Sequence, residues 1–535
     1  KTACPAHIAV QGYLKLAAQG KYREALQLIK RENPFPAVCG RICNRRCEDA
    51  CTRGTVDQAV AIDEVKRFIA QQDLDAATRF VPEKVIPKVD GEFDQQIAII
   101  GGGPAGLSCA YYLAEKGYRP TVFEKEQRLG GMLENGLPSF RLEKDVVQAE
   151  IDVLREMGVQ FRCGVEVGKD VTIAQLRQEG FRGFYVAVGL QSGGKLDIPG
   201  GDAQGVMAGI DFMRQVNGGQ CSKLAGPVVV IGGGNIAADV ARTAVRCGAE
   251  SVDLYCLEGY DEMPMGAEDR GECERDGVTI HAGWGQTEVV TRDGHAAGIR
   301  FRKCLRVKDD QGRFAPVFDD NDACEAACAT VLYCIGQKVD WRQLLTGTAV
   351  TFNPNGTAQV DPVTYQTAEP DIFAGGDAVT GQKFAIDAIA AGKEGAISLH
   401  RFVQKATLTI GRNRRQFVEL DKENALIPVG FDNTPRQRIG YNEALRRTFR
   451  DERVAFTAEQ VQKETARCLS CGASVVDPNK CIGCGVCTTK CAFDAIHLHR
   501  ERPECTNMIP SEDKMKAILP YMVKRQIKIR KARNK

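Results

Sequence analysis

The chain has 535 residues, long enough for several domains that each bury a core of their own. Its 71 Lys and Arg residues nearly balance 69 Asp and Glu residues, and a net charge of +2 gives no support for nucleic acid as a partner. No apolar run reaches the roughly 18 residues of a membrane helix, and no secretory signal opens the sequence. We therefore expect a cytoplasmic protein without a membrane span.

The 22 cysteines form three sets: five within residues 1–51, ten spread singly through 109–334, and seven within 468–505. A secreted disulfide-linked protein is usually small and rich in loops, unlike this long α/β chain. Clustered cysteines in such a chain indicate metal binding or electron transfer in a reducing compartment.

The first set has a cysteine at every fourth position of CGRICNRRCEDAC, with one more far upstream. Thiolate-only sites suit iron–sulfur clusters, and zinc is the main alternative because four thiolates also make a closed zinc site. The candidate ligands are Cys4, Cys39, Cys43, Cys47 and Cys51.

From residue 97, IAIIGGGPAGL predicts a strand, a glycine-rich turn and a helix, and TVFEKE predicts the next strand. Gly101, Gly103 and Gly106 fit G-x-G-x-x-G, in which glycines make the turn, admit a pyrophosphate and let helix and strand pack. Glu124 ends the second strand, where a carboxylate accepts hydrogen bonds from a ribose. These features predict a dinucleotide site.

A second unit of the same kind begins with VVVIGGGNIAADV at residue 228. Gly232, Gly234 and Ala237 hold the glycine-motif positions, which suggests one nucleotide domain inserted into another. Later, IFAGGDAV ends a strand on Gly-Gly-Asp. There Asp377 is placed to hold a ribityl hydroxyl, and the following helix points its N-terminus at a phosphate.

The last quarter of the chain holds a charged strap and then the third cysteine set. Four of these cysteines match C-x2-C-x2-C-x3-C, the bacterial ferredoxin run, whose fourth cysteine ligates the other cluster in two-cluster ferredoxins. Cys468 and Cys471 would join Cys491 in that other cluster. Seven thiols cannot fill eight positions, so either one ligand is not cysteine or one cluster forms. The candidates are Cys468, Cys471, Cys481, Cys484, Cys487, Cys491 and Cys505.

Taken together, the motif order resembles the glutamate synthase small-subunit family, which includes the amino-terminal module of dihydropyrimidine dehydrogenase. Beside the two glycine motifs and GGDA, the likeness rests on RLGGML (128–133) and GLPSFRL (136–142), and it covers roughly residues 1–400. The carboxy-terminal ferredoxin-like module is an addition to this pattern.

The resemblance implies an α/β fold with two nested Rossmann-like domains, preceded by a helical iron–sulfur domain. The carboxy-terminal cysteine run predicts a ferredoxin-like domain after them. The resemblance also implies FAD at Gly101, Gly103, Gly106, Glu124, Gly131 and Asp377, and NAD(H) or NADP(H) at Gly232, Gly234 and Ala237, with two to four [4Fe–4S] clusters. The expected segments are helical iron–sulfur 1–90, FAD 91–205 and 341–410, NAD(P) 206–340, strap 411–465, ferredoxin-like 466–510 and a basic tail 511–535.

The sequence departs from the family where NADPH-using members carry paired arginines, because Leu257 and Glu258 stand there. A carboxylate repels a 2′-phosphate and suits a 2′-hydroxyl, which favours NAD over NADP. The alternative is that Glu258 faces solvent and Arg270 or Arg275 contacts the phosphate.

Five amino-terminal thiols are too few for the two clusters that the family holds there. Where relatives use a carboxylate or amide ligand, this chain has Lys66, which cannot ligate while protonated. One hypothesis gives a cluster to Cys4, Cys39, Cys43 and Cys47 and assigns Cys51 to a second one, whose other ligands lie before Lys1 or are absent.

Everything identifiable in the sequence binds a dinucleotide or carries electrons. The predicted function is an electron-transfer flavoprotein: NAD(P)H reduces FAD, and clusters exchange single electrons with a partner subunit or ferredoxin, within an electron-bifurcating complex as one option. The alternatives are the small subunit of NADPH-dependent glutamate synthase and a non-catalytic assembly scaffold. No acid–base catalytic residue is assigned.

Overall fold

The computed structural model describes residues 2–83, 93–412, 421–422, 427, 430–471, 481–491, 496–498 and 510–533. It divides into two compact units, residues 1–471 and residues 472–535. The first unit holds the helical segment, both nucleotide domains and most of the strap.

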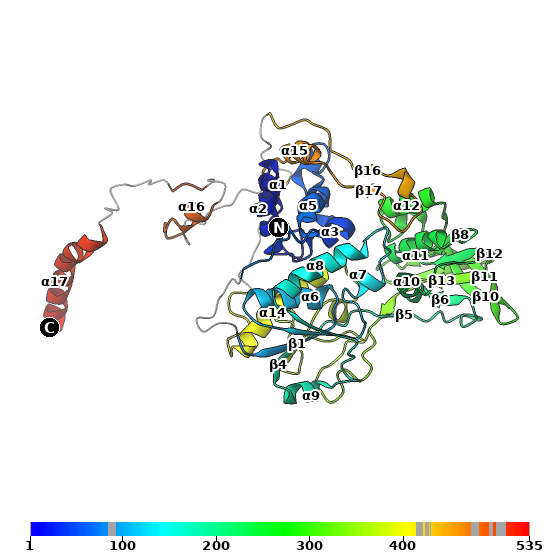
Figure 1. The fold of residues 1–535 in the computed structure, drawn as a ribbon, viewed down its shortest axis with the longest axis horizontal. Helices are drawn as coiled ribbons and strands as arrows, with labels where there is room; N and C mark the ends of the chain where they lie inside the picture. The colour runs from blue at the N-terminus through cyan, green and yellow to red at the C-terminus, as the bar shows by residue number, and fades with distance from the viewer. Residues whose placement is uncertain are drawn as a thin grey trace. The chain divides into compact units, whose positions relative to one another are not determined.

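Short amphipathic helices build the amino-terminal segment, coloured blue in Figure 1. In α2, Ala25, Leu26 and Ile29 share the buried face, as the 3.6-residue period requires. The helices are α1 (Val10–Ala18), α2 (Tyr22–Lys30), α3 (Pro36–Ile42), α4 (Arg46–Asp49) and α5 (Ile62–Ala70), with 3₁₀ turns at Thr52–Thr55 and Gln71–Asp73.

A buried carboxylate joins this segment to the first nucleotide domain. Glu150 of α8 (Lys144–Glu156) accepts hydrogen bonds from the backbone N–H groups of Ala37 and Val38, at 2.8 and 2.9 Å. These are free donors of the first turn of α3. Burial raises the pKa of Glu150 to about 8, although the two N–H donors lower it. This contact orients α3, which carries Cys39 and ends beside Cys43.

The first nucleotide domain has a five-stranded sheet in the order β15-β4-β1-β2-β3, with every neighbouring pair parallel. The hydrophobic run of β1 and the short β2 and β15 are fully buried at their centres, which is typical of parallel strands covered on both faces. The strands are β1 (Gln96–Ile100), β2 (Thr121–Glu124), β3 (Gln160–Cys163), β4 (Phe181–Val186) and β15 (Ile372–Ala374).

Two helices distant in sequence pack closely beside this sheet. A Cβ on Gly392 of α14 would lie 2.2 Å from the carbonyl oxygen of Ala105 in α6, so the backbones touch. Ser108 also donates a hydrogen bond to the carbonyl of Ile389. The domain's helices are α6 (Pro104–Glu115), α7 (Met132–Asn135), α8 (Lys144–Glu156), α9 (Ile173–Gln178), α13 (Asp377–Thr380) and α14 (Ala385–Val403).

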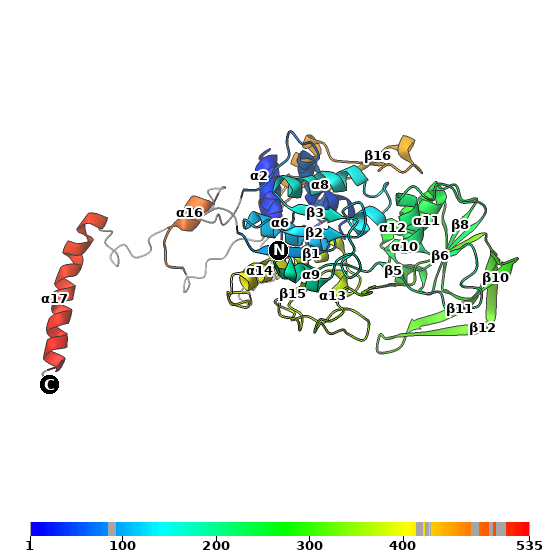
Figure 2. The same cartoon turned by 60° about the horizontal axis from the view of Figure 1, so that its bottom comes forward.

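The second nucleotide domain is inserted between β4 and β15 and is green in Figures 1 and 2. Its parallel sheet has the order β6-β13-β7-β8-β9, and an antiparallel sheet of β10, β11 and β12 extends from it. The predicted α/β class with two nested parallel-sheet domains is confirmed.

The elements of the second domain follow in chain order. They are β5 (Ser192–Gly193), β6 (Val206–Ala208), α10 (Gly209–Asn217), β7 (Val228–Ile231), α11 (Asn235–Arg246), β8 (Val252–Cys256), a 3₁₀ turn at Tyr260–Glu262, α12 (Ala267–Asp276), β9 (Thr279–Ala282), β10 (Trp284–Arg292), β11 (His295–Lys308), β12 (Phe314–Ala327), β13 (Thr330–Tyr333) and β14 (Gln337–Lys338).

The described part of the strap runs back over the first unit. In Figure 1 its helix α15 (Ala458–Ala466) lies beside α1 and α5, and the short strands β16 (Gly440–Tyr441) and β17 (Arg453–Val454) lie near α12. The strap therefore touches both the helical segment and the second nucleotide domain.

The second unit contains α16 (Val486–Lys490) and α17 (Lys514–Arg533), the latter after a 3₁₀ turn at Ser511–Asp513. None of the helices in the described ranges is at once long enough and apolar enough to cross a membrane.

Candidate active site and cysteine groups

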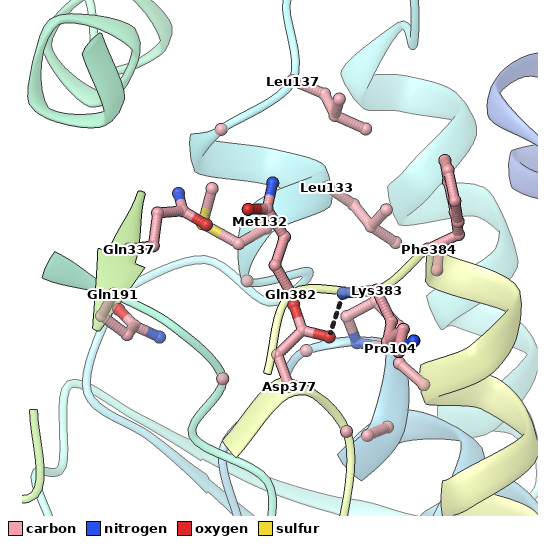
Figure 3. Close-up of a pocket in the computed structure, with 18 of the residues that line it drawn as sticks. Pro104, Met132, Leu133, Leu137, Gln191, Gln337, Asp377, Gln382, Lys383 and Phe384 are labelled. Carbon is pink, nitrogen blue, oxygen red and sulfur yellow. Dashed lines mark hydrogen bonds between the residues drawn. The ribbon is translucent and has the colours of Figure 1, made fainter. Parts of the chain in front are cut away.

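A cavity lies where the two nucleotide domains and the helical segment meet. It has a volume of about 220 Å³ and is partly open to solvent. Figure 3 shows Asp377 and Gln382 between Gln191 and Gln337 on one side and Phe384 on the other. Five of the predicted flavin residues line this cavity, namely Gly101, Gly103, Glu124, Gly131 and Asp377.

A second hollow of about 280 Å³ shares Gly101 and Glu124 with the first. Its other walls include Phe123, Lys125 and Trp341. The two spaces meet at the glycine-rich turn, so together they make an elongated site. Such a shape fits a dinucleotide whose two halves lie on either side of its pyrophosphate.

The glycines of the first motif have two different roles. Gly101 has φ +107°, and a Cβ there would lie 2.4 Å from the carbonyl oxygen of Ala187. A Cβ on Gly106 would lie 2.0 Å from the carbonyl oxygen of Gly101. A Cβ on Gly103 would meet only the Cα of Gly131, at 3.9 Å. Gly101 and Gly106 are therefore needed for packing, whereas Gly103 leaves free space at the N-terminus of α6 for a ligand.

Glu124 lies at the end of β2 with its carboxylate against this turn. It accepts hydrogen bonds from the N–H groups of Gly102 at 2.7 Å and Glu126 at 2.9 Å. Burial raises the pKa of Glu124, and the two N–H donors oppose that rise. An ionised carboxylate has about four acceptor sites, which leaves capacity for ribose hydroxyls.

Asp377 lies in the cavity at the start of α13. Its carboxylate accepts a hydrogen bond from the N–H of Lys383 at 3.3 Å, drawn in Figure 3. Burial raises its pKa to about 6, with a smaller contribution in the same direction from Asp387. This carboxyl therefore titrates within the range in which flavoproteins are commonly handled.

The inner glycine motif repeats the geometry of the first one. Gly232 has φ +139°, and a Cβ there would lie 2.8 Å from the carbonyl oxygen of Cys334. No atom lies within 4 Å of a Cβ placed on Gly234, at the N-terminus of α11. Ala237 is fully buried in that helix. Close packing thus accounts for the small residues at 232 and 237, whereas Gly234 leaves space in which a ligand could bind.

Glu258 occupies the place in the second domain that Glu124 occupies in the first. Its Oε2 lies 2.7 Å from the Cβ position of Gly233, and the Oε2 of Glu124 lies 3.1 Å from that of Gly102. Glu258 thus lies against the inner turn, where a nucleotide ribose would bind.

Arg270 and Arg275, the two candidates for contacting a 2′-phosphate, have different partners. Arg275 forms an ion pair with Glu452 of the strap and lies 4.4 Å over the ring of Tyr441. Arg270 lies 5.0 Å over Tyr260, in the loop that follows Glu258. Arg270 also forms an ion pair with Asp261 at 4.0 Å, so it contacts the loop after Glu258, whereas Arg275 contacts the strap.

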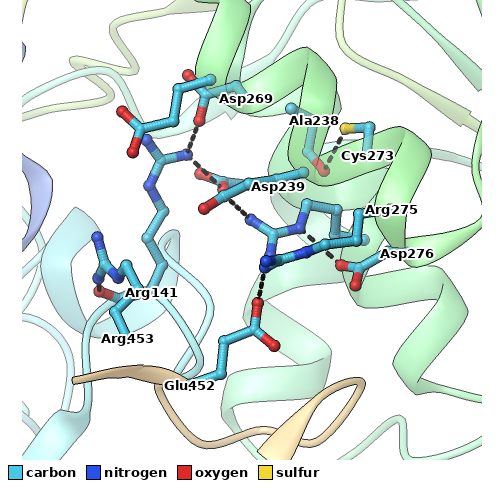
Figure 4. Close-up of polar contacts among 12 residues, drawn as sticks. Arg141, Ala238, Asp239, Asp269, Cys273, Arg275, Asp276, Glu452 and Arg453 are labelled. Carbon is cyan, nitrogen blue, oxygen red and sulfur yellow. Dashed lines mark hydrogen bonds and ion pairs between the residues drawn. The ribbon is translucent and has the colours of Figure 1, made fainter. Parts of the chain in front are cut away.

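Arg141, from the quoted GLPSFRL segment, connects the two nucleotide domains. Figure 4 shows its guanidinium between Asp239 of α11 and Asp269 of α12, at 2.8 and 2.9 Å. Burial opposes its charge, but the two carboxylates outweigh burial and raise its pKa. Arg453 of the strap donates to the Arg141 carbonyl at 2.9 Å. Arg141 and Asp239 also line the large cavity, so this contact borders the site.

Three of the amino-terminal cysteines gather around Lys66. Its side chain is 4% exposed and paired with Asp63. Burial lowers the pKa of Lys66, but Asp63 and the thiolates of Cys43 and Cys39 outweigh burial and raise it. Cys47 also lies within range of this charge, and Cys4 within range of Cys43. A charged Lys66 has no lone pair for iron and instead offsets the negative charge of the thiolates.

Cys51 lies with a different pair of cysteines. Burial raises the pKa of Cys468, and the nearby thiols of Cys471 and Cys51 add to that rise. Gln11 of α1 places its Nε2 3.5 Å from the sulfur of Cys471. The structure thus brings Cys468 and Cys471 to the helical segment, a contact that the sequence spacing did not predict.

The ferredoxin run lies in the second unit, where Cys481, Cys484 and Cys487 are exposed and Cys491 is half-buried. Cys505 lies outside the described residues. Within the described ranges, no group of three or more His, Cys, Asp or Glu side chains has the arrangement needed for a single metal ion.

Several residues of the large cavity were not predicted from sequence. Ile42 of α3 lines it, as do Asp239, Gln382 and Phe384. Gln382 follows the GGDA motif closely, so that motif was an available signal. Nothing in the local sequence connects Ile42 or Asp239 with the flavin residues, because those contacts arise only when the domains pack together.

Comparison with known families places three models on the chain. Residues 95–392 match the pyridine nucleotide-disulphide oxidoreductase model, residues 1–78 the dihydropyrimidine dehydrogenase domain II 4Fe-4S cluster model, and residues 474–497 the 4Fe-4S binding domain model. The chain belongs to the FAD/NAD(P) iron–sulfur oxidoreductases. Its cofactors are FAD, NAD(P)H and 4Fe-4S clusters, which decides against zinc and against a non-catalytic scaffold.

Three curated relatives illustrate the breadth of this family. The beta subunit of NADP(+)-dependent formate dehydrogenase from Moorella thermoacetica is 34% identical over 88% of this chain and 69% of its own length. The beta subunit of NADPH-Fe(3+) oxidoreductase from Geobacter sulfurreducens is 29% identical, over 88% and 74%. The glutamate synthase [NADPH] small chain from Halomonas elongata is 32% identical, over 73% and 85%.

Among solved structures, the Mycobacterium tuberculosis oxidoreductase FprA is similar with a TM-score of 0.51 and 16% identity, covering 70% of this chain and 99% of FprA. This likeness supports the fold of the two nucleotide domains.

The Gly234→Ala variant tests whether Gly234 is needed for nicotinamide binding rather than for packing of the protein. The added methyl group meets no protein atom, so we expect unchanged thermal stability, while the KM for NAD(P)H rises about tenfold, equal to about 1.4 kcal/mol. Gly106→Ala should instead destabilise the fold by about 1–3 kcal/mol and release FAD, because its Cβ overlaps the turn. Steady-state kinetics, thermal melts and flavin absorbance measure these effects. Gly271→Ala, on exposed α12, is the control, and an unchanged KM in Gly234→Ala contradicts the assignment.

Asp377→Asn tests the flavin contact through its pH dependence. An ionised Asp377 accepts hydrogen bonds from flavin hydroxyls, so FAD affinity should fall as pH drops through about 6, where this carboxyl takes up a proton. The variant should bind FAD about tenfold more weakly at pH 8 and lose that pH dependence. Equilibrium dialysis of FAD between pH 5 and 8 measures both. An identical pH profile in the two proteins would contradict the role of Asp377.

Proposed function

We propose that the chain is the flavin-containing electron-transfer subunit of a larger redox complex. The observation that carries this proposal is the position of α3. Its last residue, Ile42, lines the flavin cavity, and the next residue, Cys43, lines an adjoining cavity together with Arg141 and Asn235. A cysteine of the iron–sulfur segment therefore lies beside the place where the nucleotide domains meet.

The chain's own residues position the reactants. FAD, when bound, accepts reducing equivalents in pairs from nicotinamide and returns them singly. The turn at Gly101 and Gly103 receives one pyrophosphate at the N-terminus of α6, and Gly234 leaves room for the other at α11. Leu133 and Phe384 add apolar side chains to the lining of the cavity, where they would contact the bound rings.

The partner is proposed to be another redox subunit or a ferredoxin. Two relatives are named as beta subunits, of a formate dehydrogenase and of an Fe(3+) oxidoreductase. The ferredoxin-like run provides an electron exit in the second unit. Helix α17 carries Lys and Arg residues and no Asp or Glu, so an acidic partner surface would suit it. The runner-up remains the glutamate synthase small chain, for which glutamate formation with an amidotransferase chain is the test.

Anaerobic titration tests the electron-transfer proposal. NADH or NADPH is added stepwise to protein of known iron and flavin content, and visible and EPR spectra are recorded. We expect both flavin bleaching and cluster EPR signals in the same titration, in the order of the midpoint potentials of the centres, because electrons that enter at the flavin equilibrate with the clusters. Flavin bleaching without any cluster signal, at potentials low enough to reduce ferredoxin, would contradict the proposed route.

For the nicotinamide, we propose that Glu258 favours NADH, although the relatives are named for NADP(H). Glu258→Gln removes the repulsion toward a 2′-phosphate and weakens the ribose contact. The ratio of kcat/KM for NADH over NADPH should fall about tenfold, equal to about 1.4 kcal/mol. Glu262→Gln, four residues on and exposed, is the matched control. A wild-type protein that strongly prefers NADPH would overturn this proposal and direct attention to Arg270.

A further inference from the structure

We propose that Cys51, Cys468 and Cys471 together hold one [4Fe–4S] cluster, distinct from the cysteine group around Lys66 and from the ferredoxin-like run. The three thiols come from opposite ends of the chain. The sequence spacing alone had paired Cys468 and Cys471 with Cys491. The proposal concerns the location of a cluster and stands whether or not the proposed partner is correct.

A hydrogen bond joins the two backbone segments next to these thiols. Arg53, two residues after Cys51, donates from Nη1 to the carbonyl oxygen of Arg467 at 3.1 Å, and Arg467 directly precedes Cys468. The segment that carries Cys51 is therefore in contact with the segment that carries Cys468.

The buried side chains of Arg467 and Glu464 stabilise this arrangement. The side chain of Arg467 is fully buried and forms ion pairs with Glu464 at 2.7 Å and Asp57 at 3.0 Å. It also donates to the carbonyl of Gln58 at 2.7 Å. Glu464 in turn accepts the N–H of Ala61 at 2.7 Å. Burying such groups costs several kcal/mol unless each is fully paired, so the strap binds this loop in one specific register.

The polar groups around the pair suit ligated sulfur. Ser470 has φ +52°, an uncommon conformation for a residue other than glycine, and its backbone N–H donates to the sulfur of Cys468. Gln11 provides a side-chain N–H to the sulfur of Cys471 at 3.5 Å. N–H groups directed at sulfur are among the features that set the potential of an iron–sulfur cluster.

We assign an iron–sulfur cluster rather than a zinc ion to these thiols because the matching family models are of 4Fe-4S clusters. In the described part of the chain no three such side chains are arranged for a single metal ion. A cubane binds each thiolate to a different iron, so its ligands lie farther apart than the ligands of a zinc ion. The set supplies three of the four ligands that a cubane takes.

The location also makes sense for electron transfer. Cys51 follows Cys47 by four residues, through a turn in which the Cys51 N–H bonds to the Glu48 carbonyl at 2.9 Å. A cluster on Cys51 would therefore be a near neighbour of one that includes Cys47. Along the chain, Cys471 precedes the first cysteine of the ferredoxin run by ten residues.

Single serine variants of the full-length holoprotein test the proposal. Cys51→Ser, Cys468→Ser and Cys471→Ser should each lose about four irons and the same EPR signal, and the Cys51→Ser/Cys468→Ser double variant should lose no more. Cys481→Ser should remove a different signal, and Cys221→Ser, a thiol outside all three groups, should remove none. A double variant that loses two sets of iron, or single variants that keep their iron, would overturn the proposal.

A second measurement covers variants that fail to fold. Cys481, Cys484, Cys487 and Cys491 are replaced by serine together, which leaves the first unit unchanged. We expect Cys468 and Cys471 to stay protected from maleimide in this protein and to react once iron is chelated, as read by mass spectrometry. Immediate labelling of both, as expected if they depended on Cys491, or zinc in place of iron, would overturn the proposal. Flavin content and nicotinamide oxidation are measured in parallel, so failure of the electron-transfer proposal remains distinguishable.

Discussion

The hydrogen bonds from the start of α3 to Glu150 are the contact on which the electron route depends. They hold the first turn of α3 against α8 of the flavin domain, and the last residue of α3 is the one that reaches the cavity. A helix of seven residues is too short to persist alone, so its direction comes from these tertiary contacts. Together with the packing of α3 against α5, these bonds fix the position of Cys43 within the first unit.

Arginine–carboxylate pairs likewise hold the strap against the rest of the first unit. Arg453 contacts Arg141 of the flavin domain and Asp451, while Glu452 pairs with Arg275 of the second domain. Burial would raise the pKa of Asp451, but Arg453 and Arg67 lower it below its usual value. Since unpaired charges in these positions would be costly, the network permits only one placement of the strap. Three parts of the first unit are thereby held together by a segment with little secondary structure.

The two nucleotide domains use the same solution at their glycine-rich turns. In each, one glycine has positive φ close to a neighbouring carbonyl, another leaves ligand space at a helix N-terminus, and a glutamate lies against the turn. Glu124 and Glu258 occupy equivalent positions in the two domains, and this structural equivalence is a reason to expect a ribose contact at both. The proposed preference for NADH over NADPH rests on the one short loop that contains Glu258.

The sequence by itself determined the α/β class, the nesting of the two domains, the flavin and nicotinamide motifs and the iron–sulfur chemistry. Those features depend on local patterns. A strand–turn–helix unit has its own periodicity, and the predicted role of Gly101 or Asp377 follows from its position in such a unit. Only the tertiary structure decided that Ile42 and Asp239 share a cavity with the flavin residues, and that Cys51 lies with Cys468 and Cys471. The physical reason is that these groups are brought together by long-range contacts of buried polar groups, such as Glu464 with the N–H of Ala61, and a single residue type carries no information about its distant partner.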